Sequence, residues 1–170
     1  MPKRSYGDPD CAVARSLEQM GDGWTLLVLR EAFFGTRRFA DFSSRLSIAK
    51  NVLSNRLGSM VEHGLLEKVQ AGRFGDRFEY QLTRKGKDLA TVLAALRQWG
   101  DRWIFEGQAP LEVVDTATGE PILPIRIRRS DGTPVPAREM RFQPGPGASP
   151  EAWAARRLPN DEDPNDEDPE

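Results

Sequence analysis

Cysteine and histidine, which build many catalytic and metal sites, occur once each in the 170 residues of this sequence. A single cysteine, Cys11, cannot form an internal disulfide, which agrees with a reducing compartment. The lone His63 precedes Gly64 at the expected end of a helix, where it would bond terminal carbonyl groups. We recognise no nucleophile with a base, no glycine-rich phosphate loop and no metal-ligand cluster. The sequence therefore predicts a protein that is not an enzyme and holds neither cofactor nor metal.

Long apolar runs are also lacking. No stretch approaches the roughly 20 apolar residues that a membrane helix needs. The N-terminus contains the basic pair Lys3-Arg4 without an apolar run behind it, so we predict no signal peptide. With 38% hydrophobic and 29% charged residues, the composition is that of a soluble globular protein. We expect a cytoplasmic protein that does not engage membranes.

The net charge of −2 hides an uneven distribution. Residues 1 to 106 carry 17 Lys and Arg against 13 Asp and Glu, a balance of +4, whereas residues 107 to 170 carry 7 against 13, a balance of −6. We predict three regions that follow this asymmetry. Residues 1–106 form a helical domain with a small sheet, residues 107–146 a small β-rich lobe, and residues 147–170 an acidic, disordered tail with a repeated Pro-Asn-Asp-Glu-Asp segment.

Apolar residues recur at helical spacing in four segments before Gly64. Two alternating segments follow, 66–70 and 77–83, and the glycine-bearing turn between them predicts a β-hairpin. Thr83 then caps a long helix that we expect to reach about Glu106. This order predicts a winged helix-turn-helix domain, mainly α with a small β sheet. The four helices are marked by Val13, Leu17 and Met20; by Trp24 to Phe33; by Phe39, Phe42 and Leu46; and by Leu53, Leu57, Met60 and Val61.

The fourth helix, over about 49 to 63, has two unlike faces. At about 100° per residue, its apolar residues fall on one side, whereas Asn51, Ser54 and Asn55 fall on the other, with Lys50 beside them. The only acid on the polar side, Glu62, comes last. Amide and hydroxyl groups can pair with base edges, and the N-terminal half of such a helix enters the major groove. We therefore predict that this helix reads duplex DNA.

Arginines that flank the helix and the hairpin tip would hold phosphates and set the register of the protein on DNA. Each of them alone is as often a solvated surface residue, and their grouping around one polar helix favours the DNA interpretation. The predicted DNA-binding residues are Arg37, Arg38, Arg45, Ser47, Lys50, Asn51, Ser54, Asn55, Arg56, Arg73 and Arg77.

Five separated motifs closely resemble HxlR-type regulators of the MarR-like superfamily. They are residues 11–17, 23–31, 38–42, 51–57 and 79–86, and the resemblance covers about residues 11 to 106. It implies a winged-helix homodimer that acts at promoters, usually as a repressor. Members often carry a proline before the second strand, where this sequence has Phe74-Gly75-Asp76-Arg77, and this departure concerns the wing geometry and not the fold.

A second apolar stripe predicts dimerisation independently. Its residues follow a 3-4-3-4 spacing over four turns of the last long helix, which is the seam of a helix that packs on another helix. The alternative is that the stripe covers its own domain. We favour a two-fold homodimer on a near-palindromic operator, with half-sites about one helical turn apart. The predicted interface residues are Val13, Leu17, Leu89, Val92, Leu96, Trp99 and Trp103.

Cys11 has two interpretations. Related regulators often sense oxidants or electrophiles through a cysteine at this place, and Arg15, one helical turn further on, would favour the thiolate. The alternative is a small buried residue at a helix start. A small-molecule effector is a further expected partner.

Some longer relatives carry Cys-Gly knuckles after the helical domain, in a lobe that resembles a zinc ribbon. Here Thr118 and Asp131 precede the glycines, and no cysteine is present, so a tetrahedral cysteine site is excluded. We predict a metal-free β lobe that retains the hairpins of a degenerate zinc ribbon and leans on the helical domain. Its expected mini-core is Val113, Ile122, Ile125, Ile127, Val135 and Phe142.

The rival to a DNA-binding regulator is a winged-helix module that binds proteins and not DNA. Acids on the outward face of the fourth helix would favour that module, and the N-terminal half of that face lacks them.

Overall fold

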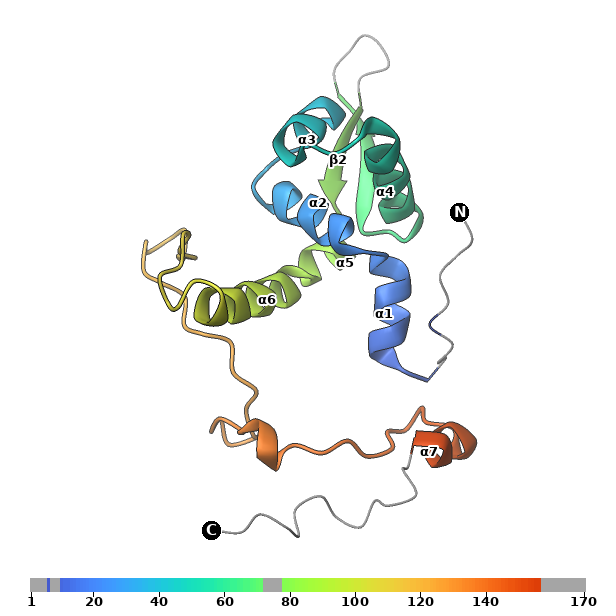
Figure 1. The fold of residues 1–170 in the computed structure, drawn as a ribbon, viewed down its shortest axis with the longest axis vertical. Coiled ribbons are helices and arrows are strands. Elements are labelled where there is room, and N and C mark those ends of the chain that lie inside the picture. The colour runs from blue at the N-terminus through green and yellow to red at the C-terminus, as the bar shows by residue number, and fades with distance from the viewer. Residues whose placement is uncertain (1–5, 7–9, 72–77, 157–170) are drawn as a thin grey trace. The chain divides into compact units, whose positions relative to one another are not determined.

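The computed structural model describes residues 6, 10–71 and 78–156 of the chain (Figure 1). It divides the chain into two compact units. One is formed by residues 19–134, and the other by residues 1–18 together with residues 135–170.

Four helices precede the sheet, and they lie where the apolar spacing predicts them. They are α1 (Ala12–Met20), α2 (Gly23–Phe33), α3 (Phe39–Leu46) and α4 (Lys50–Glu62). Gly64, with φ +68°, follows α4 in a left-handed conformation that glycine adopts without steric cost. His63 Nδ1 lies 2.8 Å from the carbonyl oxygen of Ser59, so the predicted bonding of a terminal carbonyl by His63 is confirmed.

The predicted hairpin is present as strands β1 (Leu66–Gln70) and β2 (Phe78–Leu82). They pair antiparallel, with Leu66 opposite Leu82 and Gln70 opposite Phe78. The backbone N–H of Tyr80 also donates to the carbonyl of Arg37 at 2.8 Å, which attaches the segment before α3 to β2. The hairpin tip, with the predicted DNA-binding residues Arg73 and Arg77, lies outside the described residues.

The hydrophobic core lies where α2, α3 and α4 meet around the two strands (Figure 1). The apolar stripes of the three helices fill it, because each stripe must leave water and only a neighbouring element can cover it. The buried core residues are Val28, Leu29, Phe42, Ile48, Leu53, Leu57, Met60, Leu65 and Leu66.

The long helix predicted after Thr83 is interrupted, so the prediction of one continuous helix is wrong. Thr83 does cap a helix, since its Oγ accepts from the Gly86 N–H at 3.0 Å. That helix, α5 (Arg84–Asp88), ends at Leu89, where the backbone N–H bonds back only three residues to the Gly86 carbonyl at 3.2 Å. α6 (Ala90–Trp103) then continues the chain. A three-residue bond tightens the turn and breaks the helical repeat.

The segment after α6 keeps two hairpin turns but forms no core. Single antiparallel bridges join Val114 to Pro121 and Arg128 to Pro134. Thr133 donates two hydrogen bonds to the Asp131 carboxylate, from its backbone N–H at 2.8 Å and its hydroxyl at 2.7 Å, and these hold the pKa of Asp131 below its usual value. The residues predicted as a mini-core are exposed, except the half-buried Val135, so that prediction is wrong for the single chain. Turns this short bring too few apolar neighbours together to exclude water.

Part of this segment leans on the helical domain, as expected. Arg97 Nη1 donates to the Leu111 carbonyl at 2.6 Å. Gln98 makes a pair of bonds with the backbone of Ile125, accepting from its N–H at 2.7 Å and donating to its carbonyl at 3.2 Å. The attachment is therefore made by polar side chains of α6 and not by an apolar interface.

The unit made of the two chain ends contains a short helix in the region predicted as a tail. After the 3-10 turn η1 (Ala137–Glu139), helix α7 (Pro150–Arg156) carries the half-buried Trp153. Just before α7, the Ser149 hydroxyl donates to Asp10 Oδ2 at 2.8 Å, which joins the segment before α1 to the segment before α7 within this unit. The acidic repeat from residue 157 lies outside the described residues.

Among the glycines of the described residues, Gly86 has the closest neighbour, and its replacement tests how α5 packs against the segment before β1. A Cβ at this position would overlap the backbone carbonyl of Leu65, which cannot swing away as a flexible side chain would. We expect Gly86→Ala to lower the free energy of unfolding by roughly 1 to 3 kcal/mol, as overpacked sites do. Urea denaturation followed by circular dichroism measures the change.

Gly58→Ala is the matched control. Nothing lies within 4 Å of a Cβ at Gly58, in the interior of α4. Alanine there should raise the free energy of unfolding by about 0.5 to 1 kcal/mol, because glycine weakens a helix interior. Equal effects of the two substitutions on the free energy of unfolding would contradict the close contact between Gly86 and the Leu65 carbonyl.

Candidate nucleic-acid interface

α4 presents one polar face to solvent, in the orientation that its sequence predicts. Leu53, Leu57 and Met60 are buried in the core. On the opposite side, Lys50, Asn51, Ser54, Asn55 and Gly58 are all exposed. The face has little bulk and no carboxylate until Glu62, which is also exposed at the far end. A groove of a polyanion can approach such a face without electrostatic repulsion.

The first turn of α4 has backbone donors that no capping side chain occupies. Its N-cap residue, Ala49, makes no side-chain capping bond, and the first turn holds no acid. By contrast, Asp22 caps α2 and Thr83 caps α5. α3 is also uncapped at Arg38, but Asp41 lies in its first turn. Free N–H groups and the helix dipole make the start of α4 suited to a phosphate oxygen.

The turn between α3 and α4 sets the angle at which α4 leaves the core. Ser47, an exposed residue with φ 50° and ψ 34°, makes a left-handed bend after α3. The next residue, Ile48, is buried, and its carbonyl accepts a long hydrogen bond from the Ser43 hydroxyl at 3.5 Å. One residue therefore turns the chain and the next anchors it, which leaves Ser47 beside the exposed start of α4.

Three predicted phosphate contacts, Arg37, Arg38 and Arg45, are exposed in the helix-turn-helix. Two of them also make ion pairs. Arg38 Nε lies 3.3 Å from Glu79 Oε1 of β2, and Arg45 Nη1 lies 3.6 Å from Glu31 Oε2 of α2. The Arg38 and Arg45 side chains are 67% and 60% exposed, so the pairs orient them and leave donors free for a phosphate.

Arg56 differs from the other predicted DNA-binding residues. Its Nη2 pairs with Asp22 Oδ2 at 2.7 Å, and its side chain is 24% exposed. The structure thus places Arg56 on the flank of α4 that faces the start of α2, apart from the polar face.

Three residues with structural roles at this interface escaped the sequence analysis. Asp22 precedes a helix and could have been found as a cap, but its pairing with Arg56 leaves no local signal. Buried Glu31 accepts from Arg30 at 2.8 Å and from the Thr36 hydroxyl at 3.4 Å. Lys85 donates to the carbonyl of His63 at 2.8 Å and to Gln19 at 2.6 Å, which holds the end of α4. Such pairs depend on the fold and are not visible in spacing.

The apolar stripe predicted as a dimer seam lies open on α6, and no residue of α6 is buried. The exposed fractions are 44% for Val92, 51% for Leu96, 57% for Trp99 and 62% for Trp103. Leu89 is half-buried and packs against the core. On α1, Val13 and Leu17 are exposed by 68% and 40%.

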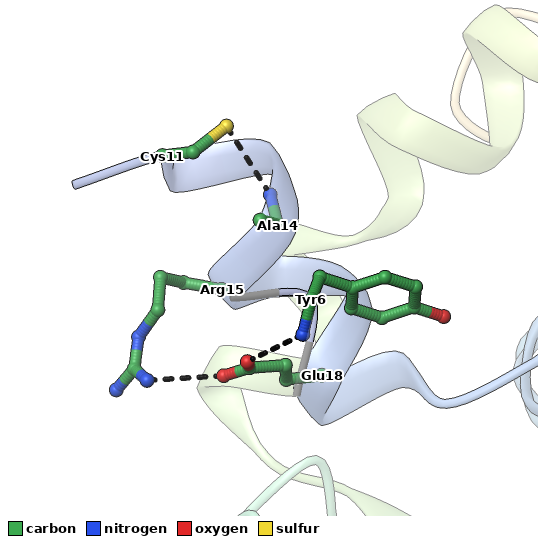
Figure 2. A network of polar contacts seen from close by, with 5 residues as sticks. All are labelled: Tyr6, Cys11, Ala14, Arg15 and Glu18. Atoms are coloured by element: carbon green, nitrogen blue, oxygen red, sulfur yellow. Dashed lines mark hydrogen bonds and ion pairs between the residues drawn. The ribbon is translucent and has the colours of Figure 1, made fainter. Parts of the chain in front are cut away.

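Cys11 stands at the start of α1, half-buried (Figure 2). Its carbonyl accepts the first helical bond, from Arg15 N–H at 2.9 Å, and its sulfur lies 3.5 Å from the Ala14 N–H. The Arg15 guanidinium does not contact the Cys11 sulfur. Figure 2 shows it turned toward Glu18, with which it pairs at 3.0 Å, and away from the sulfur. The predicted support of Cys11 by Arg15 has no contact in this structure, because the Arg15 guanidinium pairs with the Glu18 carboxylate instead.

The helix-turn-helix, the two-stranded wing and the exposed polar helix together define a winged helix-turn-helix transcription factor. The chain belongs to the HxlR-like helix-turn-helix family, whose model matches residues 19–108. It is a transcriptional regulator with a helix-turn-helix domain. The predicted family and fold class are thereby confirmed.

Relatives match beyond the helix-turn-helix domain. The HTH-type transcriptional regulator Rv3095 of Mycobacterium tuberculosis (strain ATCC 25618 / H37Rv) is 40% identical over 137 residues, 80% of this chain and 87% of the relative. The crystal structure of the candidate transcription factor PA1607 has a TM-score of 0.74 at 40% identity and covers 82% of this chain and 99% of its own. The structure of PA1374 from Pseudomonas aeruginosa, also a candidate transcription factor, has a TM-score of 0.61 at 38% identity and covers 85% of this chain and 99% of its own.

The described residues lack two further features. None of the helices there combines the length and the apolar character required to cross a bilayer. Within the same ranges, no three His, Cys, Asp or Glu side chains gather as metal ligands would.

Proposed function

We propose that this regulator is a homodimeric repressor that reads a near-palindromic duplex operator with α4. The observation that supports it is the polar face of the N-terminal half of α4, which is exposed and free of acids, at a helix start without a capping side chain. Asn51, Ser54 and Asn55 would reach base edges, while Lys50 and the backbone N–H groups of the first turn would hold a phosphate. Arg37, Arg38 and Arg45 would add phosphate contacts on the side of α3.

In this proposal Ser47 is a backbone contact at the turn, and Arg73 and Arg77 remain predicted wing contacts. Arg56, which pairs with Asp22 at the start of α2, orients α4 in this proposal and does not contact DNA. A repressor acts by occupying its operator, so the affinity of the dimer for that duplex is the quantity to measure.

Two substitutions on α4 should separate reading from phosphate binding. Asn55→Ala should weaken binding to the preferred duplex by about 1 to 3 kcal/mol, because a base-edge contact is lost. Lys50→Ala should weaken binding to every duplex and make the salt dependence of affinity shallower by about 0.9 in log–log slope. The duplex is obtained by selection from a random 30-bp library, and affinities are measured by fluorescence anisotropy at several salt concentrations.

Lys87→Ala, which removes an exposed lysine of α5, is the control for charge alone and should leave both quantities unchanged. If the wild-type protein selects no duplex, the rival protein-interaction module is the better description. The same holds if Asn55→Ala and Lys87→Ala behave alike.

The homodimer is proposed from the open stripe on α6. A stripe that covered its own domain would be buried in the single chain, whereas Leu96, Trp99 and Trp103 are more than half exposed. Exposed tryptophans on successive turns of one helix form a large contiguous apolar patch, which marks an interaction surface. A second copy of α6 offers the same stripe, so a two-fold axis would cover both at once.

Leu96→Glu should convert the dimer to a monomer, because two carboxylates would be buried face to face at the seam. Size-exclusion chromatography with multi-angle light scattering measures the mass. Thr91→Glu places the same charge on an exposed residue about 140° from Leu96 around the axis of α6 and should remain a dimer. A dimer that survives Leu96→Glu would contradict this interface.

Regulation by oxidation at Cys11 is a finer part of the proposal. The thiol is half-buried, so a small oxidant reaches it, and it accepts the Ala14 N–H at the helix start. Its oxidation to a sulfenic acid would enlarge and polarise this position. A shift of α1 would follow, and with it a change of the dimer.

Mild oxidation with hydrogen peroxide should reduce operator affinity by tenfold or more in the wild-type protein, and dithiothreitol should restore it. Cys11→Ser should bind the operator normally and ignore the oxidant. Operator binding that is unchanged in protein shown by mass spectrometry to be oxidised at Cys11 would rule out this regulation.

A further inference from the structure

A single carboxylate joins the reading helix to the start of α2. Asp22 Oδ1 accepts the Trp24 N–H at 3.0 Å and so caps α2, while Asp22 Oδ2 pairs with Arg56 Nη2 of α4 at 2.7 Å. The two side chains are 31% and 24% exposed. Partial shielding from water makes this ion pair stronger and more directional than a fully exposed one.

The backbone of Gly21 lies close to the Arg56 guanidinium. Gly21 has φ +78°, and a Cβ there would lie 3.1 Å from Arg56 Nη1, so both backbone conformation and space favour glycine. In the part of the chain that the structure describes, Arg56 Nε is buried without a hydrogen-bond partner. A buried unpartnered donor is unfavourable. The guanidinium therefore stays here at a free-energy cost that a leucine at position 56 would avoid.

Arg56 lies on a different flank of α4 from the side chains that face solvent. At about 100° per residue, it is about 100° from Asn55 and about 160° from Ser54 around the helix axis. Its partner Asp22 is fixed by the N-terminus of α2, which is packed in the core through Val28 and Leu29. The pair thus resists rotation of α4 about its own axis.

Rotation is the motion to which base recognition is most sensitive. A turn of about 10° moves a group that lies about 5 to 6 Å from the helix axis by about 1 Å. Hydrogen bonds to base edges are lost over such a distance, since their donor–acceptor range spans only about 0.5 Å. Phosphate contacts through long basic side chains adjust more easily.

We propose that Asp22 is a positioning residue for DNA recognition, which fixes the rotation of α4 through Arg56 and so sets the discrimination between DNA sequences. The proposal rests on the proposed DNA-binding function. It assigns to Asp22 an effect on specificity that exceeds its effect on non-specific affinity.

The test is Asp22→Asn in the full-length protein. Asparagine caps a helix as well as aspartate does, so the α2 cap is kept while the charge that holds Arg56 is removed. Affinity is measured for the duplex selected by the wild-type protein and for a scrambled duplex of equal length. We expect the ratio of the two affinities to fall about tenfold, with affinity for the scrambled duplex within about twofold of wild type.

Arg56→Gln removes the other partner and leaves Asp22 in place. It should lower the same ratio to a similar extent, and the double variant should be no worse than either single variant, because both act through one pair. If Asp22→Asn fails to fold, Arg56→Gln carries the comparison. Asp101→Asn is the matched control, since it breaks the Arg97–Asp101 pair of α6, at 3.1 Å, away from α4.

Three results would overturn the proposal. A ratio unchanged within twofold in both variants would show that the pair does not orient α4. A parallel loss of specific and scrambled affinity, with a matching fall in thermal stability, would show a merely structural role. Failure of the wild-type protein to select any duplex would remove the proposed function itself and the proposal with it, and it differs from the other two because it appears before any substitution.

Discussion

The burial of one face of α4 is the interaction on which the rest of the structure depends. Leu53, Leu57 and Met60 leave water by packing against α2, α3 and the sheet, and this contact fixes which way the opposite face points. Each such side chain contributes about 1.5 to 3 kcal/mol through burial, which far exceeds what its polar neighbours gain from any orientation. Burial of these residues therefore decides which face of α4 points to solvent, and in our proposal the Asp22–Arg56 pair sets the finer rotation of the helix.

The same rule explains how much the sequence predicts. Helical spacing of apolar residues identifies α1 to α4 and the alternating segments identify the hairpin, because burial imposes those periods on any compact chain. Thr83 and Gly64 mark a helix start and a helix end through local chemistry alone. The exposed character of Asn51, Ser54 and Asn55 follows from the wheel once Leu53 and Leu57 are taken as core.

What the sequence does not predict depends on residues that are distant in the chain. The Asp22–Arg56 pair spans 34 positions. Arg15 lies within one helical turn of both Cys11 and Glu18, and it pairs with the Glu18 carboxylate. The break at Leu89 arises in the turn next to Gly86, where the backbone of another element leaves no room for a side chain. Residues 107–134 mislead for a different reason, since their apolar content predicts a core while their short turns keep those residues apart in one chain.

The contact between Gly86 and Leu65 has a consequence for the geometry of an assembly. Because the backbone of Gly86 in α5 lies against the Leu65 carbonyl just before β1, with no side chain between them, we expect the start of α6 to be held closely to the end of α4. In the proposed dimer, the distance between the two reading helices would then be fixed by the packing of α5 and α6 and would not adjust to the DNA. On a DNA site one base pair longer, with one half-site shifted by about 3.4 Å and turned by about 34°, only one of the two reading helices could bind at a time.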